Sequence, residues 1–174
     1  MKIKHDKLEQ YDLVISDYID KAEDRYAPWI GLFLIRFSEL EHTLDTTIAD
    51  FLMDRSHEMG YLVIAGTSLN NKIELFRKLF HLHTKYMRPQ KLARLKRLVK
   101  RLHDLRVFRN YVAHANWSTL EKTGYVRTRI DEKDGEVILK KVRMTPDKIN
   151  SWVGRIEVAD EDLYDFAENM TEDV

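Results

Sequence analysis

Three polar side chains near residue 110 have the types and spacing for chemistry on a phosphate. Arg109, Asn110 and His114 fall within about one and a half turns of an expected helix. An arginine can hold a phosphodiester through two hydrogen bonds, and a histidine can move protons near neutral pH because its ordinary pKa is about 6.5. The run therefore predicts phosphate chemistry, with these three as candidate catalytic residues.

The spacing puts these groups on two faces of the helix. At about 100° per residue, His103, Arg106, Asn110 and His114 share one polar stripe, whereas Arg109 and His114 point roughly 140° apart. A long arginine side chain, a frayed helix end or a second copy of the chain could bring the two together. Alternatively, such residues near a helix C-terminus only complement the helix dipole and hydrogen-bond the last carbonyls.

Hydrophobic periodicity predicts the elements that position this run. The first expected helix starts near Leu8 and ends near Tyr26 and Ala27, ahead of Pro28. A second helix is expected from Pro28 to about Asp54, followed by a loop around Ser56 to Gly60 and an apolar segment from Tyr61 to Ala65. The next helix is capped by Thr67 or Ser68 and fades near Lys85 to Arg88. The motif helix then runs from Leu92 through Val112.

The pattern changes from helical to alternating after Trp117. We expect a β-hairpin at about residues 118–144, with its turn at Asp131–Gly135. Thr145 and Pro146 then start a C-terminal helix through Phe166, with a break allowed around Val158 to Asp160. Because no linker or repeat separates these pieces, we predict one mainly all-α domain over residues 1–174.

Composition narrows the classes of function. The chain has 174 residues, 29 basic and 29 acidic side chains and no cysteine, so disulfides and cysteine-ligated zinc are excluded and a reducing, cytoplasmic location is expected. Its charged N-terminus does not resemble a signal peptide, and its apolar runs are too short to span a membrane. We find no metal-binding motif, no glycine-rich phosphate loop and no serine nucleophile elbow, so no metal and no cofactor are predicted.

Charge is polarised along the sequence. Cations dominate from Arg88 to Arg109, where Asp104 is the one acid, and every charged residue from Glu157 onward is acidic. The basic helix either pairs with the acidic one or faces a polyanion. In the second case the candidate RNA-binding residues are Arg97, Lys100, Arg101 and Trp117; Trp117 could stack on a base or simply anchor the core.

The stretch from Arg109 to Trp117 resembles the signature of the HEPN superfamily. In that signature four to six residues separate an arginine from a histidine, and the first of them, directly after the arginine, is polar. This resemblance implies an antiparallel helical bundle, in which the hairpin is an insertion between the motif helix and the C-terminal helix. It also implies a metal-independent endoribonuclease that forms a homodimer, places two motifs in one cleft and leaves a 2′,3′-cyclic phosphate. Arg109 would hold the phosphate, His114 would act as general acid or base, and Asn110 would orient His114 or the phosphate.

The resemblance suggests a bacterial toxin-antitoxin or abortive-infection (phage defence) protein, with an antitoxin or another defence protein as partner. The chain has Asn116 where some toxin members carry a tyrosine, so regulation through a modified tyrosine is not expected. Supporting roles are assigned to Arg106 and His103, and to Glu39 or Glu41, which could orient His114 or pair with Arg109 unless they lie on a solvated face. The competing function is a noncatalytic dimerisation module that binds RNA or an acidic protein.

Overall fold

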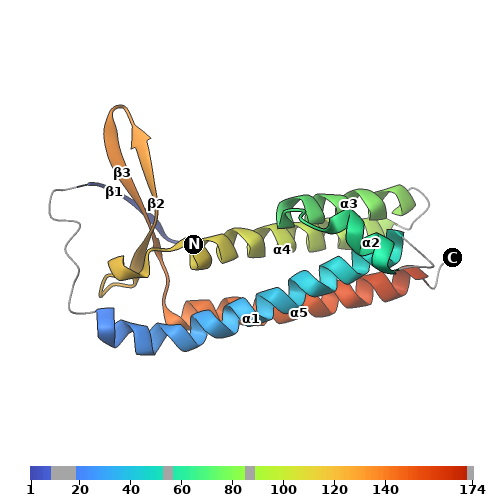
Figure 1. Cartoon of the computed structure of the whole chain (residues 1–174), viewed down its shortest axis with the longest axis horizontal. Helices are drawn as coiled ribbons and strands as arrows, with labels where there is room; N and C mark the ends of the chain where they lie inside the picture. The colour runs from blue at the N-terminus through green and yellow to red at the C-terminus, as the bar shows by residue number, and fades with distance from the viewer. Residues whose placement is uncertain (9–18, 53–56, 85–88, 172–174) are drawn as a thin grey trace. The chain divides into compact units, whose positions relative to one another are not determined.

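The computed structural model describes residues 1–8, 19–52, 57–84 and 89–171, and within them the chain is mainly helical with one small antiparallel sheet (Figure 1). The elements follow in the order β1 (Ile3–Lys7), α1 (Ile19–Leu52), α2 (His57–Ile64), α3 (Leu69–Thr84), α4 (Pro89–His114), the 3₁₀ turn η1 (Trp117–Thr119), β2 (Tyr125–Lys133), β3 (Glu136–Arg143) and α5 (Pro146–Thr171). The mainly helical class predicted from the sequence is confirmed.

The chain divides into two compact units. Unit 1 comprises Met1–Leu34 and Phe108–Trp152, and unit 2 comprises Ile35–Val107 and Val153–Val174. The sheet lies in unit 1, while α2 and α3 lie in unit 2, and α1, α4 and α5 each contribute a segment to both. The single domain over residues 1–174 stays a prediction.

The sheet of unit 1 contains the expected hairpin and one further strand. β2 and β3 pair from Tyr125↔Arg143 to Lys133↔Glu136, and the two-residue turn between them has positive φ at Asp134 (55°) and Gly135 (78°). That geometry is the type I′ turn whose twist suits a hairpin. β1 pairs with the other edge of β3, so the strand order is β1-β3-β2. We did not predict β1, because five residues with charges on both faces carry little alternating signal.

Helix α1 corrects the predicted boundary at Pro28. We expected one helix to end before this proline and a second to begin at it, yet α1 continues from Ile19 to Leu52 with Pro28 inside. A proline in a helix loses a hydrogen bond and clashes with the preceding turn. Buried side chains on both sides offset this cost, because Tyr26 donates its hydroxyl to the Met144 carbonyl (3.2 Å) and Phe33 packs edge-on against Phe108 (5.4 Å). The predicted start near Leu8 falls largely on residues outside the described part.

Helix α2 is a second correction, because His57–Gly60 is helical where a loop was expected. Glycine lowers helix propensity, which explains the wrong prediction. Here Gly60 lets α2 approach α1 closely: a Cβ at this position would lie 2.6 Å from the Cα of Ala49. Burial against α1 thus outweighs the weak local preference.

The starts of α3 and α5 are confirmed by their caps. The amide of Asn71 donates to Ser68 Oγ (3.4 Å), and the amide of Lys148 donates to Thr145 Oγ1 (3.3 Å). Pro146 then occupies the first turn of α5, where its missing N–H costs nothing. α5 runs to Thr171 without the break allowed near Val158.

Unit 2 has its own apolar core. Phe80 of α3 packs against Phe76 (ring centroids 4.6 Å), against Phe51 of α1 (4.4 Å) and against Phe166 of α5 (5.4 Å). Leucines of α4 complete the core at helical spacing, namely Leu95, Leu98, Leu102 and Leu105. One face of α4 is therefore buried, and its cations lie on the remaining faces.

Candidate functional site

The motif lies on the last two turns of α4, within unit 1. Phe108 and Val112 are buried, and Phe108 stacks on Trp152 with ring centroids 4.2 Å apart. These two side chains fix the rotation of the helix end. Arg109 and Asn110 are consequently half-buried, and His114, the last residue of the helix, is exposed.

Arg109 and Asn110 are in contact. The guanidinium Nη1 of Arg109 donates to Oδ1 of Asn110 at 3.4 Å, a long hydrogen bond between neighbours. This bond occupies the amide oxygen of Asn110 and leaves its NH₂ group as the donor side. Asn110 thus helps to orient Arg109, a contact that the sequence pattern did not indicate.

Arg109 and His114 diverge, as the spacing predicts for a regular helix. α4 stays helical through His114. Five residues correspond to about 7.5 Å of rise and roughly 140° of rotation between the two side chains. Asn110 and His114, one turn apart, share a face. The two groups with the strongest chemical roles are therefore presented on different sides of this helix end.

Trp117 holds the end of α4 in place. Its indole Nε1 donates to the carbonyl of Val112 (3.1 Å), and its ring lies 5.7 Å from the ring of Tyr26. The Val112 carbonyl is one of the last four of the helix, which have no partner inside it. Just before Trp117, the amide of Asn116 donates to the carbonyl of Arg127 in β2 (2.8 Å). The helix end is thus tied both to its own last turn and to the sheet.

Sequence reasoning missed this capping role. It placed Trp117 either on a nucleic acid base or in the core, and the structure uses its N–H within the fold. A tryptophan three residues beyond the end of a helix was the available signal, since its N–H can reach back to the last turn. The predicted base-stacking role stays a prediction.

The supporting residues proposed from the sequence belong to unit 2, where three of them have polar partners. Arg36 donates to Glu39 (2.9 Å), and it also lies 3.8 Å from Glu157. The remaining pairs are Lys72 with Glu41 (3.4 Å) and His103 Nε2 with Glu74 (3.2 Å). Structural ion pairs and one hydrogen bond thus account for part of the polarity that suggested a site.

Arg106 differs from these three residues. Its Nε is buried, and no acceptor in the described part of the chain lies within hydrogen-bond distance of it. A buried donor without an acceptor costs about 1–3 kcal/mol unless a water or another group satisfies it. Within the described part of the chain, Arg106 therefore has a buried donor that no protein acceptor satisfies.

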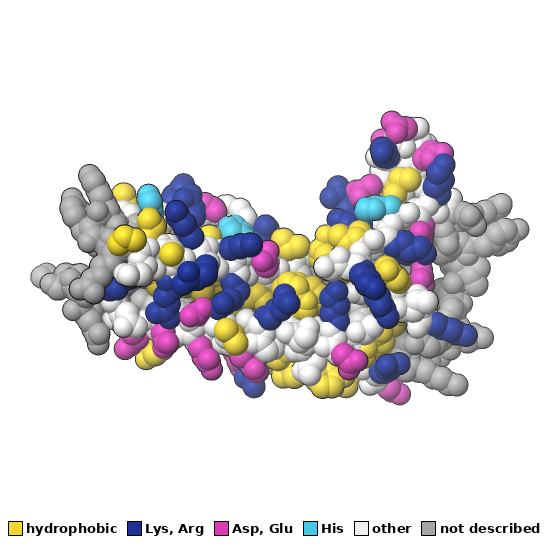
Figure 2. All heavy atoms as spheres, turned by 180° about the vertical axis from the view of Figure 1, so that it is seen from behind, with side chains coloured by type: hydrophobic (Ala, Val, Ile, Leu, Met, Phe, Trp, Pro, Cys, Tyr) yellow, Lys and Arg dark blue, Asp and Glu magenta, His cyan; other side chains and the backbone are white. Residues whose placement is uncertain are grey.

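The acidic helix neutralises part of the basic one. Arg94 donates to the side chain of Asp162 (3.3 Å), and Arg101 forms a close ion pair with the same carboxylate. This arrangement is the first of the two alternatives drawn from the charge pattern. Arg97 and Lys100 are exposed, and no carboxylate in the described residues lies within ion-pair distance of either. On the face drawn in Figure 2, dark blue Lys and Arg side chains are spread over much of the surface, with magenta Asp and Glu side chains among them.

In residues 1–8, 19–52, 57–84 and 89–171, no three His, Asp or Glu side chains come together in a way that could hold a metal ion. Over the same ranges, no helix is long and apolar enough to cross a membrane.

Comparisons of the chain with protein-family models, with curated proteins and with solved structures gave no match.

Proposed function

We propose that this chain is a metal-independent endoribonuclease of a prokaryotic defence or toxin-antitoxin type, acting in the cytoplasm as a homodimer. The observation that carries the proposal is the end of α4: Arg109, bonded to Asn110, and an exposed His114 are held there by the Trp117 cap. An arginine–histidine pair supplies positive charge and proton transfer without a metal. The defence role rests only on the resemblance of the motif to HEPN proteins.

The proposed reaction is an internal attack within the RNA. His114 of one copy removes the proton of a ribose 2′-hydroxyl, and the 2′-oxygen forms a bond to the adjacent phosphorus. The bond from phosphorus to the 5′-oxygen breaks, and that oxygen receives the proton that the same His114 imidazolium now carries. Arg109 stabilises the charge on the phosphoryl oxygens. The products are a 2′,3′-cyclic phosphate and a 5′-hydroxyl, and no co-reactant is consumed.

A second copy of the chain answers the divergence of Arg109 and His114. In one copy these groups lie on different sides of a regular helix, roughly 140° apart. Two helix ends related by a twofold axis can place Arg109 of one copy next to His114 of the other. We therefore propose a composite site that a single chain does not complete.

The central test is cleavage of RNA by the purified protein in the presence of a chelator. A panel of single-stranded, stem-loop and transfer RNAs is incubated with wild type, Arg109→Ala and His114→Ala, and the cut ends are analysed for the cyclic phosphate. We expect each substitution to lower the rate by about 10²–10⁴-fold. His42→Ala is the matched control, because His42 is also an exposed histidine on a helix but lies outside the motif.

Mixing the two inactive variants tests the composite site. Heterodimers of Arg109→Ala and His114→Ala contain one site with an intact Arg109 and an intact His114 from different copies. Random exchange should restore roughly a quarter of the wild-type rate, since about half of the dimers are mixed and each has one good site of two. No restoration would contradict the shared site. Unchanged cutting by the single variants would contradict catalysis by this motif altogether.

A noncatalytic dimerisation module that binds RNA or protein is the second candidate. It is favoured by the polar contacts that already engage Glu39, Glu41, His103 and Arg101 in unit 2, because these contacts give the four side chains a structural role without any reaction. A folded wild-type dimer that binds RNA from the panel but leaves it uncut would support this candidate over the ribonuclease.

A further inference from the structure

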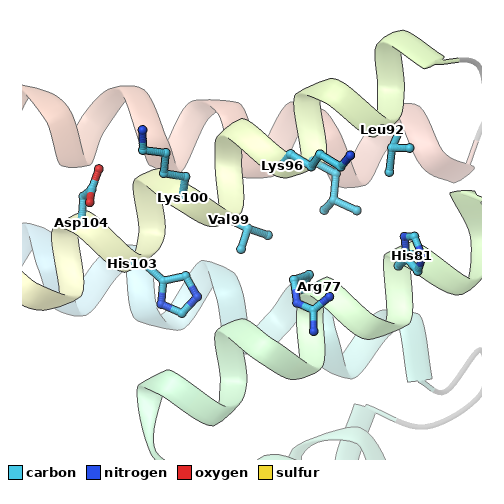
Figure 3. A pocket seen from close by; sticks show the side chains of 9 residues that line it. Arg77, His81, Leu92, Lys96, Val99, Lys100, His103 and Asp104 are labelled. Atoms are coloured by element: carbon cyan, nitrogen blue, oxygen red, sulfur yellow. The ribbon is translucent and has the colours of Figure 1, made fainter.

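A groove lies between α3 and α4 in unit 2, and none of Arg109, Asn110 and His114 lines it. Its volume is about 400 Å³, and Figure 3 shows Arg77 and His81 entering it from α3 while Val99 and His103 point toward it from α4. The floor is aliphatic. It is formed by Leu92, Leu95 and Val99.

The rim of the groove is cationic. Lys96 and Lys100 lie one helical turn apart on α4 and are exposed, with Arg77 facing them from α3. In the described residues no carboxylate lies within ion-pair distance of either lysine. Arg77 contacts Glu74 (2.9 Å), which is not part of the lining, and the single acidic side chain in the lining is Asp104. The groove thus offers an excess of positive charge around an apolar strip.

Another flank of α4, which also combines cations with apolar side chains, already binds an acidic helix within the chain. Along this flank, Arg94 and Arg101 lie two turns apart, and both bind Asp162 of the acidic helix α5. Apolar side chains of α5, Leu163 and Phe166 among them, are buried beside these ion pairs. On that flank, an acidic amphipathic helix supplies both the carboxylates and the apolar contacts.

The chemistry of the lining also favours a helix over nucleic acid. Single-stranded RNA binds most tightly where aromatic side chains stack on its bases. The lining contains no Phe, Tyr or Trp, and of its two imidazole rings, those of His81 and His103, the ring of His103 is hydrogen-bonded to Glu74 (3.2 Å). An aliphatic floor flanked by charges instead suits a helix laid in a groove, with leucine-like side chains at helical spacing and acidic residues on either side.

We propose that the groove between α3 and α4 is a docking site for an acidic amphipathic helix of a partner protein. The apolar stripe of that helix covers Leu92, Leu95 and Val99, and its carboxylates pair with Arg77, Lys96 and Lys100. This proposal does not depend on whether the chain cuts RNA, because it uses none of the motif residues.

The test measures binding of designed helices to the whole protein by fluorescence anisotropy. The probes are labelled, stapled peptides of about four turns with leucines at i, i+3, i+4 and i+7, flanked by glutamates, prepared in several registers. Unstructured polyglutamate controls for charge alone, and labelled polyuridine tests the nucleic acid alternative. We expect at least one helix to bind, polyglutamate to bind at least about tenfold more weakly, and affinity to fall with added salt.

Charge reversals on one helix locate the binding site. The double variant Lys96→Glu with Lys100→Glu should bind the peptide helix about tenfold or more weakly, because two attractive charge pairs become repulsive. Arg97→Glu is the matched control: it is an exposed cation on the same helix, but it does not line the groove, so its effect should stay under about threefold. Leu92→Gln should lower the affinity for the peptide helix and leave the affinity for polyglutamate unchanged. Circular dichroism verifies that each variant is folded.

Three outcomes would overturn the proposal. No helix of the set binds; or Arg97→Glu weakens binding as much as the double reversal; or polyuridine binds the wild type more tightly than every helix and depends on Lys96 and Lys100. The last result would identify the groove as an RNA surface.

Discussion

Replacing Trp117 with phenylalanine isolates the hydrogen bond that caps the motif helix. The indole donates to the Val112 carbonyl at 3.1 Å, and its ring lies 5.7 Å from that of Tyr26. Trp117→Phe keeps an aromatic ring beside Tyr26 and removes only the donor and part of the ring area. The carbonyl of Val112, in the last turn of α4, then loses its side-chain partner.

The expected cost follows from the lost bond and the carbonyl left behind. A net hydrogen bond contributes about 0.5–1.5 kcal/mol, and a buried group without a partner costs about 1–3 kcal/mol. Val112 is 1% exposed, whereas Trp117 is only half-buried, so water can replace part of the bond. We expect the free energy of unfolding to fall by about 1.5 kcal/mol, which lowers the urea midpoint by roughly 0.5–1 M.

Urea unfolding followed by far-ultraviolet circular dichroism measures this change, and amide hydrogen exchange at His114 and Asn116 shows whether the helix end frays. Trp29→Phe is the control, because Trp29 is also half-buried in a helix of unit 1. An unchanged midpoint and unchanged exchange in Trp117→Phe would refute the capping role. If RNA affinity dropped while stability stayed constant, base stacking would be the better account of Trp117.

Two further predictions concern ion pairs inside each unit. Lys72→Met should destabilise the protein by about 2 kcal/mol in urea unfolding, because Asp45, 2.7 Å from the buried ammonium group, keeps its charge without that partner. Adding Asp45→Asn should recover part of the lost stability. Equal stability of the single and the double variant would contradict this explanation. In unit 1, burial raises the pKa of the Asp6 carboxyl, but hydrogen bonds from Lys4 and Lys141 outweigh it and hold the pKa below its ordinary value. Because the folded pKa is the lower one, this stabilisation is present above about pH 4 and is lost as pH falls through the folded pKa. The protection factors of the amides in Ile3–Lys7, which are corrected for the intrinsic pH dependence of exchange, should therefore fall on acidification, and Lys141→Met should weaken that fall.

Local chemistry explains which elements the sequence could predict. Ser68 and Thr145 cap their helices through hydrogen bonds three residues away, and Asp134 with Gly135 forms the hairpin turn. Each of these signals is contained in a few adjacent residues. The continuation of α1 through Pro28 and the helix around Gly60 depend instead on burial against distant segments, which no local pattern reports.

The same distinction separates the predicted and unpredicted parts of the site. Spacing alone gave the opposed directions of Arg109 and His114, because it depends only on helix geometry. The partners of Glu41, His103 and Arg101 come from other helices, tens of residues away in the chain. The sequence could identify these residues as polar candidates for a functional site, but it could not distinguish a structural contact from a catalytic one.

The capped helix end narrows the ways in which the motif could form one site. Fraying of the last turn would let Arg109 and His114 approach each other, but it must break the bond from Trp117 to Val112 and strain the one from Asn116 to Arg127. At about 1 kcal/mol for each bond, the frayed state would make up only a few per cent of the molecules. Every catalytic event through the frayed state would include this cost of fraying the helix end, whereas a composite site formed by two copies leaves both hydrogen bonds intact. If fraying were nevertheless the route, Trp117→Phe would speed cleavage while it destabilised the fold; a composite site predicts that the same variant slows it.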